Sequence, residues 1–140
     1  MKLSARSRYG FRAILQLAVE YGKGLLQVKT IAKREDISVK YLEQLMAMLK
    51  VAGLVRTKRG PGGGNFLAKQ PSEIKLSEIF SVLEGPLCSV ECTKHAKFSK
   101  GCADCVTRQV WSKIQGTIWD FFDSMTLQDL VDMAEEKKKP

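Results

Sequence analysis

The side chains best suited to bind a metal in this 140-residue chain lie together, between residues 88 and 105. They are all four of its cysteines and its single histidine: Cys88, Cys92, Cys102, Cys105 and His95. The cysteines form one Cys-x3-Cys pair and one Cys-x2-Cys pair, and both thiolates of such a pair can reach one metal site. The spacing therefore predicts metal ligation or redox chemistry in this segment.

Three kinds of chemistry fit these thiols. A structural Zn²⁺ matches the count of four thiolates and the tetrahedral geometry that zinc prefers. A thiol switch without a metal is a second alternative, and an iron–sulfur cluster is the third. A [2Fe–2S] cluster needs no ligand beyond four thiolates and is favoured, although a [4Fe–4S] cluster uses the same number.

The N-terminus and the hydropathy indicate a reducing compartment. Residues 1–6 lack the apolar core of a signal peptide, and no apolar run approaches the ~20 residues of a membrane span. We therefore expect a cytoplasmic protein without a membrane segment. Disulfides are rare there, which favours the metal or redox interpretation of the cysteines.

The formal net charge of +8 is unevenly distributed along the chain. Residues 1–70 hold 14 lysines and arginines against four acids, whereas residues 71–140 hold nine against eleven. A basic half joined to a mildly acidic half is typical of a nucleic-acid-binding part fused to a second part. An ordinary solvated basic surface is the alternative.

The basic half is predicted to begin with three helices, over residues 8–21, 30–35 and 39–52, with a short strand at 26–28. In the third helix Leu42, Leu45 and Leu49 share one face and are expected in the core. The outward residues are then Lys40, Tyr41, Glu43, Gln44 and Ala47. The link at residues 36–38 joins two short helices, the helix-turn-helix arrangement that places its second helix in the DNA major groove.

A glycine-rich hairpin is predicted after these helices, with strands at 54–57 and 65–68 around a loop at 58–64 (KRGPGGG). A nucleotide-binding phosphate loop is excluded, because no Lys-Ser or Lys-Thr follows the last glycine and Asn65 replaces the third glycine of a dinucleotide fingerprint. Glycines in a hairpin allow positive φ and a close approach of the backbone to DNA. We interpret the hairpin as a wing with Arg59 at its tip, able to enter a minor groove; an ordinary glycine-rich hairpin is the alternative.

The candidate DNA-binding residues follow from this arrangement: Ser38, Lys40, Tyr41, Glu43 and Gln44 on the recognition helix, and Arg56, Lys58 and Arg59 on the wing. Gln44 could pair bidentately with adenine, and Glu43 could accept a hydrogen bond from cytosine N4.

The second half is predicted to contain a helix at 77–84, a long helix at about 103–124 and a short last helix. The long helix carries a continuous apolar stripe: Val106, Val110, Trp111, Ile114, Ile118, Phe121 and Phe122. This stripe is wider than a small winged helix can cover, so we expect a two-fold interface with a second copy, the alternative being packing on its own domain. Thr126 is the expected cap of the last helix, with Asp129 at N3, and residues 137–140 are expected to be loose.

The predicted fold is therefore mainly α: a winged helix-turn-helix domain with a small β-wing at 1–84, a cysteine-rich loop at 85–104, and a dimerisation helix with a C-terminal helix at 105–140. Several motifs resemble the IscR-type winged-helix repressors, the bacterial family of iron–sulfur, nitric-oxide and cysteine-metabolism regulators that includes the NsrR and CymR types. The motifs are Arg8-Tyr9-Gly10, Ile31-Ala32, Ile37-Ser38, Tyr41-Leu42-Glu43-Gln44-Leu45, Gly53-Leu54-Val55 and Arg59-Gly60-Pro61-Gly62-Gly63-Gly64.

The resemblance runs from about residue 1 to about residue 132, and the wing motif is its most specific element. It implies a homodimer that reads a palindromic operator in double-stranded DNA. It also favours the iron–sulfur interpretation, because Cys105-Val106-Thr107-Arg108, with Trp111, looks like the segment that carries the last cluster cysteine in the family. Iron–sulfur assembly proteins are then candidate partners.

The family typically uses three cysteines and a variable fourth ligand. By resemblance the three are Cys92, Cys102 and Cys105, with Cys88 as the first candidate for the fourth and His95 as the alternative. Some members use a histidine three residues after the last cysteine or an acid near position 8. This chain has Arg108 and Arg8 at those places, and arginine does not ligate.

The predicted function is a dimeric transcriptional regulator whose DNA binding responds to a cysteine-ligated iron–sulfur cluster, and so to cluster status, iron, redox state or nitric oxide. A winged-helix regulator with a structural zinc or a cluster-free thiol switch is the main alternative. An electron-transfer or cluster-carrier protein is a third, but it needs neither a wing nor a helix-turn-helix. No nucleophile lies beside a base, so the chain is not expected to be an enzyme.

Overall fold

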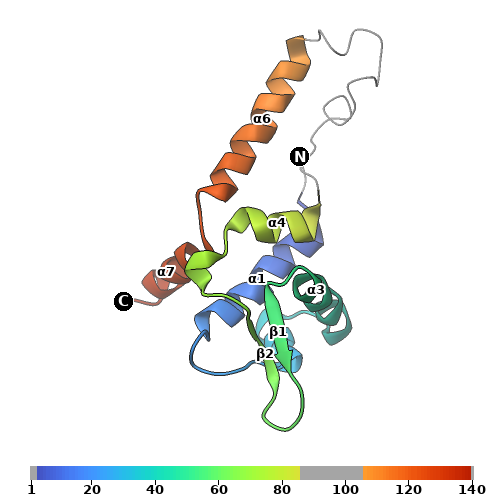
Figure 1. The fold of residues 1–140 in the computed structure, drawn as a ribbon, viewed down its shortest axis with the longest axis vertical. Helices are drawn as coiled ribbons and strands as arrows, with labels where there is room; N and C mark the ends of the chain where they lie inside the picture. The colour runs from blue at the N-terminus through green and yellow to red at the C-terminus, as the bar shows by residue number, and fades with distance from the viewer. Residues whose placement is uncertain (1–2, 86–105, 140) are drawn as a thin grey trace.

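The computed structural model describes residues 3–85 and 106–139. In chain order its elements are α1 (Ala5–Val19), α2 (Val28–Glu35), α3 (Val39–Val51), β1 (Val55–Lys58), β2 (Gly64–Leu67), the 3₁₀ turn η1 (Pro71–Glu73), α4 (Leu76–Glu84), α6 (Val106–Asp123) and α7 (Leu127–Lys138). Figure 1 shows the β1–β2 hairpin at one end of the molecule and α6 extending away at the other. The mainly helical fold with a small β-wing is confirmed.

Local signals explain the helix-turn-helix. The hydroxyl of Ser4 caps α1 by accepting from the Ser7 amide, and that of Ser38 caps α3 by accepting from the Tyr41 amide. Asp36 closes α2 in the left-handed region (φ 53°), a conformation that aspartate tolerates better than most residues. Gly53 follows α3 with φ 79°, as expected for a C-terminal cap.

The strand predicted at residues 26–28 is wrong. Leu26 makes only an isolated bridge to Asn65, and Val28 is already the first residue of α2. The predicted hairpin strands also move by one residue, since Lys58 and Gly64 pair across the ladder. At the C-terminus α7 continues to Lys138, two residues into the segment expected to be loose. The cationic side chains in its last turn stabilise the helix by interacting with the negative end of the helix dipole.

A single hydrophobic core joins the first helices to the last one. Leu42, Leu45 and Leu49 are buried as expected, together with Ile14 of α1 and Leu83 of α4. Helices α1 and α4 pack closely at Gly10, where a Cβ atom would lie 2.4 Å from Leu83 Cδ1. Leu127 and Val131 of α7 belong to the same core, and the Thr126–Asp129 capping box predicted for α7 is present.

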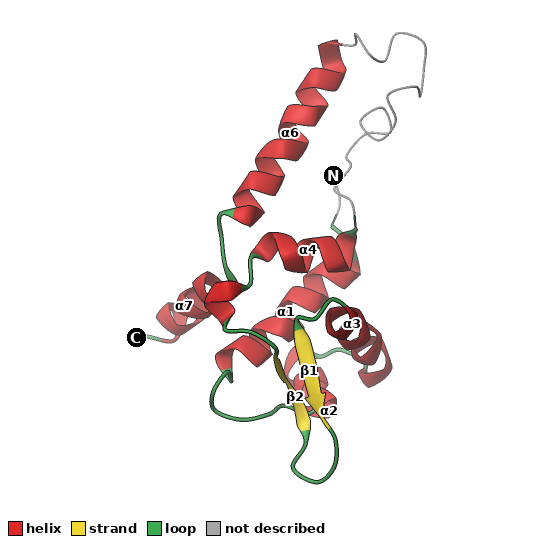
Figure 2. Ribbon diagram, in the orientation of Figure 1, coloured by secondary structure: helices red, strands yellow, loops and turns green. Residues whose placement is uncertain are grey.

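Helix α6 stands apart from this core (Figure 2). None of its residues is buried, and Val106, Val110 and Phe121 are 72%, 50% and 60% exposed. Only its C-terminal end packs inward, where the ring of Phe122 stacks on Phe80 with centroids 4.6 Å apart. Apart from Ile118 and Phe122, which are half-buried, the apolar stripe is therefore left exposed by the described part of its own chain. Within residues 3–85 and 106–139 no helix is long and apolar enough to cross a membrane.

Candidate nucleic-acid interface

Four of the five predicted recognition residues have exposed side chains: Ser38, which caps α3, and Lys40, Glu43 and Gln44 on the outer face of the helix. The fifth, Tyr41, is half-buried, and its ring meets the ring of Tyr9 edge to face with centroids 6.1 Å apart. Tyr41 thus lies beside the exposed residues of α3 and packs against α1. Periodicity along α3 could not show this, because Tyr9 lies on another helix.

The wing presents its cations to solvent. In β1 only Val55 points inward, and Arg56, Thr57 and Lys58 are exposed, as is Arg59 at the start of the loop. No ion pair found within residues 3–85 and 106–139 involves the three wing cations. Unpaired cations on a projecting hairpin can take phosphate oxygens as partners.

Glycines are required at the wing tip. Gly62 has φ 75°, and a Cβ atom on Gly63 would lie 2.2 Å from the Lys58 carbonyl oxygen. The turn is closed by the Gly63 amide, which donates to the Gly60 carbonyl at 2.9 Å. Any other residue at these positions would strain or open the turn.

A buried asparagine anchors the wing to the rest of the domain, and sequence reasoning missed it. Asn65 Nδ2 donates to the Leu26 carbonyl oxygen at 3.2 Å, and Thr57 Oγ1 donates to Asn65 Oδ1 at 2.9 Å. The Asn65 and Leu26 main chains also exchange two hydrogen bonds. A polar residue in an otherwise apolar strand was the available signal, since buried amides are almost always hydrogen-bonded.

A helix-turn-helix followed by a cationic wing is the geometry of a known family of regulators. The family model "Rrf2: Iron-dependent Transcriptional regulator" matches residues 3–133. The chain belongs to the Rrf2 family. It is accordingly a DNA-binding transcriptional regulator and not an enzyme.

Several Rrf2 relatives are similar over nearly their whole length. The HTH-type transcriptional regulator CymR of Bacillus subtilis is 35% identical over 139 residues, 99% of this chain and 96% of CymR. The solved structure of CymR, known as the global cysteine regulator of B. subtilis, is similar with a TM-score of 0.82, over 95% of this chain and 98% of that one. The regulator IscR of Pectobacterium atrosepticum is 33% identical over 96% of this chain and 82% of its own. The structure of T. potens IscR is 40% identical with a TM-score of 0.82, over 100% of this chain and 93% of that one.

The candidate metal ligands Cys88, Cys92, His95, Cys102 and Cys105 all lie outside the described residues. Among the residues that are described, no group of three or more histidine, cysteine, aspartate or glutamate side chains could hold a metal ion. The metal site therefore stays a prediction from the sequence.

The segment that carries these cysteines starts directly after a well-defined contact. The Glu84 carboxylate, at the end of α4, accepts from the Ser4 amide at 3.3 Å, from Ser4 Oγ at 2.7 Å and from Ser7 Oγ. Partial burial raises the pKa of Glu84, but the hydrogen bonds from Ser4 and Ser7 and the charge of Arg6 outweigh it, so its pKa lies below the ordinary value. Glu84 thus ties the end of α4 to the start of α1.

This contact predicts a pH dependence of stability. Because the Glu84 pKa is lower in the folded protein, its contribution is present above the unfolded pKa of about 4.3 and is lost as the pH falls through the folded pKa. Glu84→Gln should lower the free energy of unfolding at pH 7 by about 1 kcal/mol and flatten its decline in acid. Urea unfolding between pH 3 and 7 measures this, with Glu78→Gln of the same helix as the control. Equal effects of the two substitutions would contradict the assignment.

Proposed function

We propose that the protein is a homodimeric regulator that reads a palindromic operator, with α3 in the major groove and the wing in the neighbouring minor groove. The observation that carries this proposal is the exposed row of Ser38, Lys40, Glu43 and Gln44 on the same domain as the wing cations, for which no ion pair is found within residues 3–85 and 106–139. Polar side chains that can read base edges and cations that can bind phosphates are the two components of sequence-specific binding. The proposed location is the cytoplasm, where bacterial operator DNA lies.

Gln44→Ala tests the assignment of the recognition helix. We expect the substitution to cost about 1–3 kcal/mol on the preferred site and to relax the preference at one base pair, because a bidentate contact to a base edge is lost. Lys58→Ala on the wing is the comparison, since loss of a phosphate contact should weaken all sequences alike. The measurement is affinity for a duplex that the wild type selects from a random library, and for its single-base variants. Uniform weakening by Gln44→Ala would make Gln44 a positioning contact.

Dimerisation through α6 is the second part of the proposal. Its support is the exposed stripe of Val106, Val110, Trp111, Ile114 and Phe121. The stripe continues at Phe121 into an apolar hollow of about 380 Å³ against the domain, lined by Phe11, Phe80, Phe122 and Met133 among others. A second copy would cover both surfaces. Two related heads would then read two half-sites, with centres about 34 Å or a multiple apart.

The third part concerns the cysteines. We propose an iron–sulfur cluster, [2Fe–2S] in preference to [4Fe–4S], held by Cys92, Cys102 and Cys105 with Cys88 or else His95 as the fourth ligand. Soft thiolate donors fit such a cluster, and the matching family is described as iron-dependent. When bound, the cluster supplies a centre that responds to redox state, iron or nitric oxide. Iron–sulfur assembly proteins are then the expected source of the cluster.

A regulator without a cluster is kept as a second candidate, because the CymR relative, named as a cysteine regulator, matches 99% of this chain. In that case the same cysteines would act as a thiol switch or hold a structural zinc. The absorption spectrum separates the two candidates: anaerobically purified protein with a cluster is coloured, and zinc or free thiols give no colour.

Either chemistry could control DNA binding through the position of the cysteine segment in the chain. Residues 86–105 connect Glu84, which is tied to α1, with Val106 at the start of α6. Ligation restricts the conformations of a loop. A change in this segment would therefore alter how the two DNA-reading domains are spaced on the proposed dimer.

A further inference from the structure

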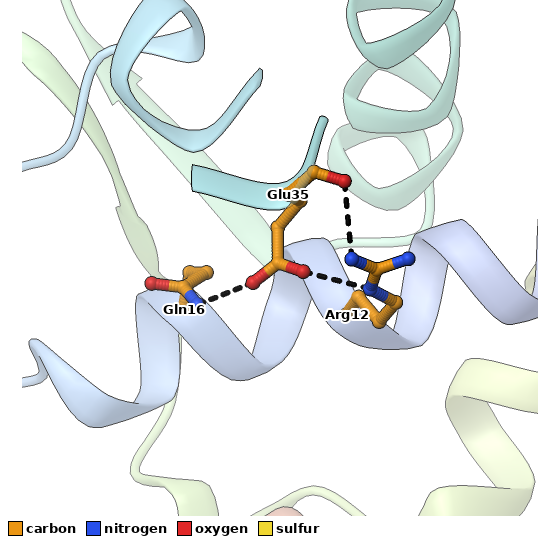
Figure 3. Close-up of polar contacts among 3 residues, drawn as sticks. All are labelled: Arg12, Gln16 and Glu35. Carbon is orange, nitrogen blue, oxygen red and sulfur yellow. Dashed lines mark hydrogen bonds and ion pairs between the residues drawn. The ribbon is translucent and has the colours of Figure 1, made fainter. Parts of the chain in front are cut away.

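Glu35, the last residue of α2, holds two side chains of α1 (Figure 3). Arg12 Nε donates to Glu35 Oε2 at 2.7 Å, Arg12 Nη2 donates to the Glu35 carbonyl oxygen at 3.1 Å, and Gln16 Nε2 donates to Glu35 Oε1. The Glu35 side chain is only 13% exposed, whereas that of Arg12 is 51% exposed. Two bonds to one residue fix the plane of the Arg12 guanidinium, which a single ion pair would not do.

The fixed guanidinium packs on an aromatic ring. Arg12 Cζ lies 5.7 Å from the centroid of the Tyr9 ring, and Arg8 Cζ lies 5.8 Å from it. Both distances are within the range of a cation–π contact. The Tyr9 ring in turn meets Tyr41 edge to face at 6.1 Å and 90°, a favoured geometry for aromatic pairs. A continuous series of contacts therefore runs from Glu35 through Arg12 and Tyr9 to Tyr41.

Tyr41 is the point at which this series reaches the recognition helix. The Tyr41 amide donates to Ser38 Oγ at 3.2 Å, and this hydrogen bond caps the first turn of α3. The Tyr41 ring contacts the Tyr9 ring of α1. Lys40 and Glu43, on the same turns, are exposed. The buried leucines of α3 set its rotation about its axis, and the ring contact adds a constraint at its first turn, where the side chains that could reach base edges begin.

We propose that Tyr9 and Arg12 are positioning residues for base recognition: they set the orientation of Tyr41 and of the first turn of α3. This inference rests on the proposed role of α3 in reading DNA. By this inference the contact between α1 and α2 at Glu35 contributes to base specificity as well as to the stability of the fold.

A matched pair of substitutions tests the proposal. Arg34 is 44% exposed on the same α1–α2 interface and contacts Gln16 Oε1 at 3.2 Å and Glu20 Oε1 at 3.5 Å. No cation–π contact of Arg34 is found within residues 3–85 and 106–139. Arg12→Gln and Arg34→Gln thus remove the same charge from one interface, and only Arg12→Gln removes one of the two cation–π contacts of Tyr9, the other being that of Arg8.

The probe is the duplex that the wild type selects from a random library, with its single-base variants. We expect Arg12→Gln to lower the ratio of affinities for the selected duplex and its variants about fivefold, and Arg34→Gln to leave the ratio unchanged. The effect of Arg12→Gln should vanish in a Tyr41→Ala background, because it acts through Tyr41. The slope of log affinity against log salt should match that of Arg34→Gln.

Three results would overturn the inference. Uniform weakening on all duplexes, with a salt slope lower by about 0.9 than that of Arg34→Gln, would make Arg12 a direct phosphate contact. A lower melting temperature with unchanged base preference would make it only structural. An equal loss of preference in the Tyr41→Ala background would show that Tyr41 is not the route.

A second pair covers the case in which Arg12→Gln does not fold. Tyr9→Phe keeps the ring and should retain base preference, whereas Tyr9→Leu should lose it as Arg12→Gln does. Equal preference in both variants would contradict the proposal.

Gln44→Ala, measured on the same duplexes, distinguishes failure of this inference from failure of the proposed recognition by α3. If it lowers base preference and the Tyr9 and Arg12 variants do not, the inference alone fails. If it too has no effect, the proposed recognition by α3 fails.

Discussion

Replacing Cys92, Cys102 or Cys105 by alanine is expected to abolish the visible absorption of anaerobically purified protein and to change operator affinity by about 5- to 150-fold. The range corresponds to the usual coupling free energy between a regulatory site and a binding site. The three variants should shift the affinity in the same direction, because each removes the same ligated state of residues 86–105. Absorption spectra, iron and sulfide analysis and operator titration of the same preparations measure both effects.

Two further variants serve as internal controls for the ligand set. Cys88→Ala should bleach the cluster if Cys88 is the fourth ligand, and a retained spectrum would move that role to His95, which His95→Ala then tests. A colourless wild type with stoichiometric zinc would support the structural-metal alternative. Identical affinities of the wild type and the triple Cys92, Cys102 and Cys105 variant for several operators would remove the sensor proposal and leave a metal that only supports the fold.

Ile114→Glu is expected to convert the proposed dimer to monomers. Ile114 lies in the middle of the exposed stripe of α6 and is 42% exposed in the single chain. Two-fold symmetry would place two unpaired carboxylates in the buried interface, and this should weaken dimerisation by about 3 kcal/mol or more. The free energy of binding to a palindromic operator should weaken by at least the same amount, because the two half-sites are no longer bound by one dimer. Sedimentation and footprinting measure the two effects.

Gln109→Glu is the matched control for this prediction. Gln109 is an exposed residue of the same helix, and the 3.6-residue period places it away from the apolar stripe. The control adds the same charge and should stay dimeric. If Ile114→Glu also remained a dimer, α6 would not be the interface. A monomeric wild type that protects a single asymmetric half-site would remove the dimer altogether.

The sequence by itself predicted the features that short-range chemistry determines. The leucine spacing of α3 and the glycine after the helix, Gly53, are local signals, and both were found where they were expected. The Ser38 cap is a local feature as well, but it was found only in the structure. The wing was recognisable from its glycines, because the tight turn itself leaves no room for a Cβ atom. At Gly63 such an atom would lie 2.2 Å from the Lys58 carbonyl oxygen. The stripe on α6 was also readable from its period, and within residues 3–85 and 106–139 most of it is exposed.

The tertiary structure decided which partner each of these elements meets. The segment at 26–28 resembled a strand, but its only ladder partner among residues 3–85 and 106–139 is Asn65, and a bridge of one pair does not make a strand. Glu84 holds Ser4 from 80 residues away, and Arg12 reaches Glu35 across 23. Tyr41 could be assigned to the outer face of α3 by period alone, yet its ring is fixed by Tyr9 of α1. Periodicity gives the direction of a side chain on its own helix, whereas the contact it makes depends on how the helices pack, and that is determined by the whole core.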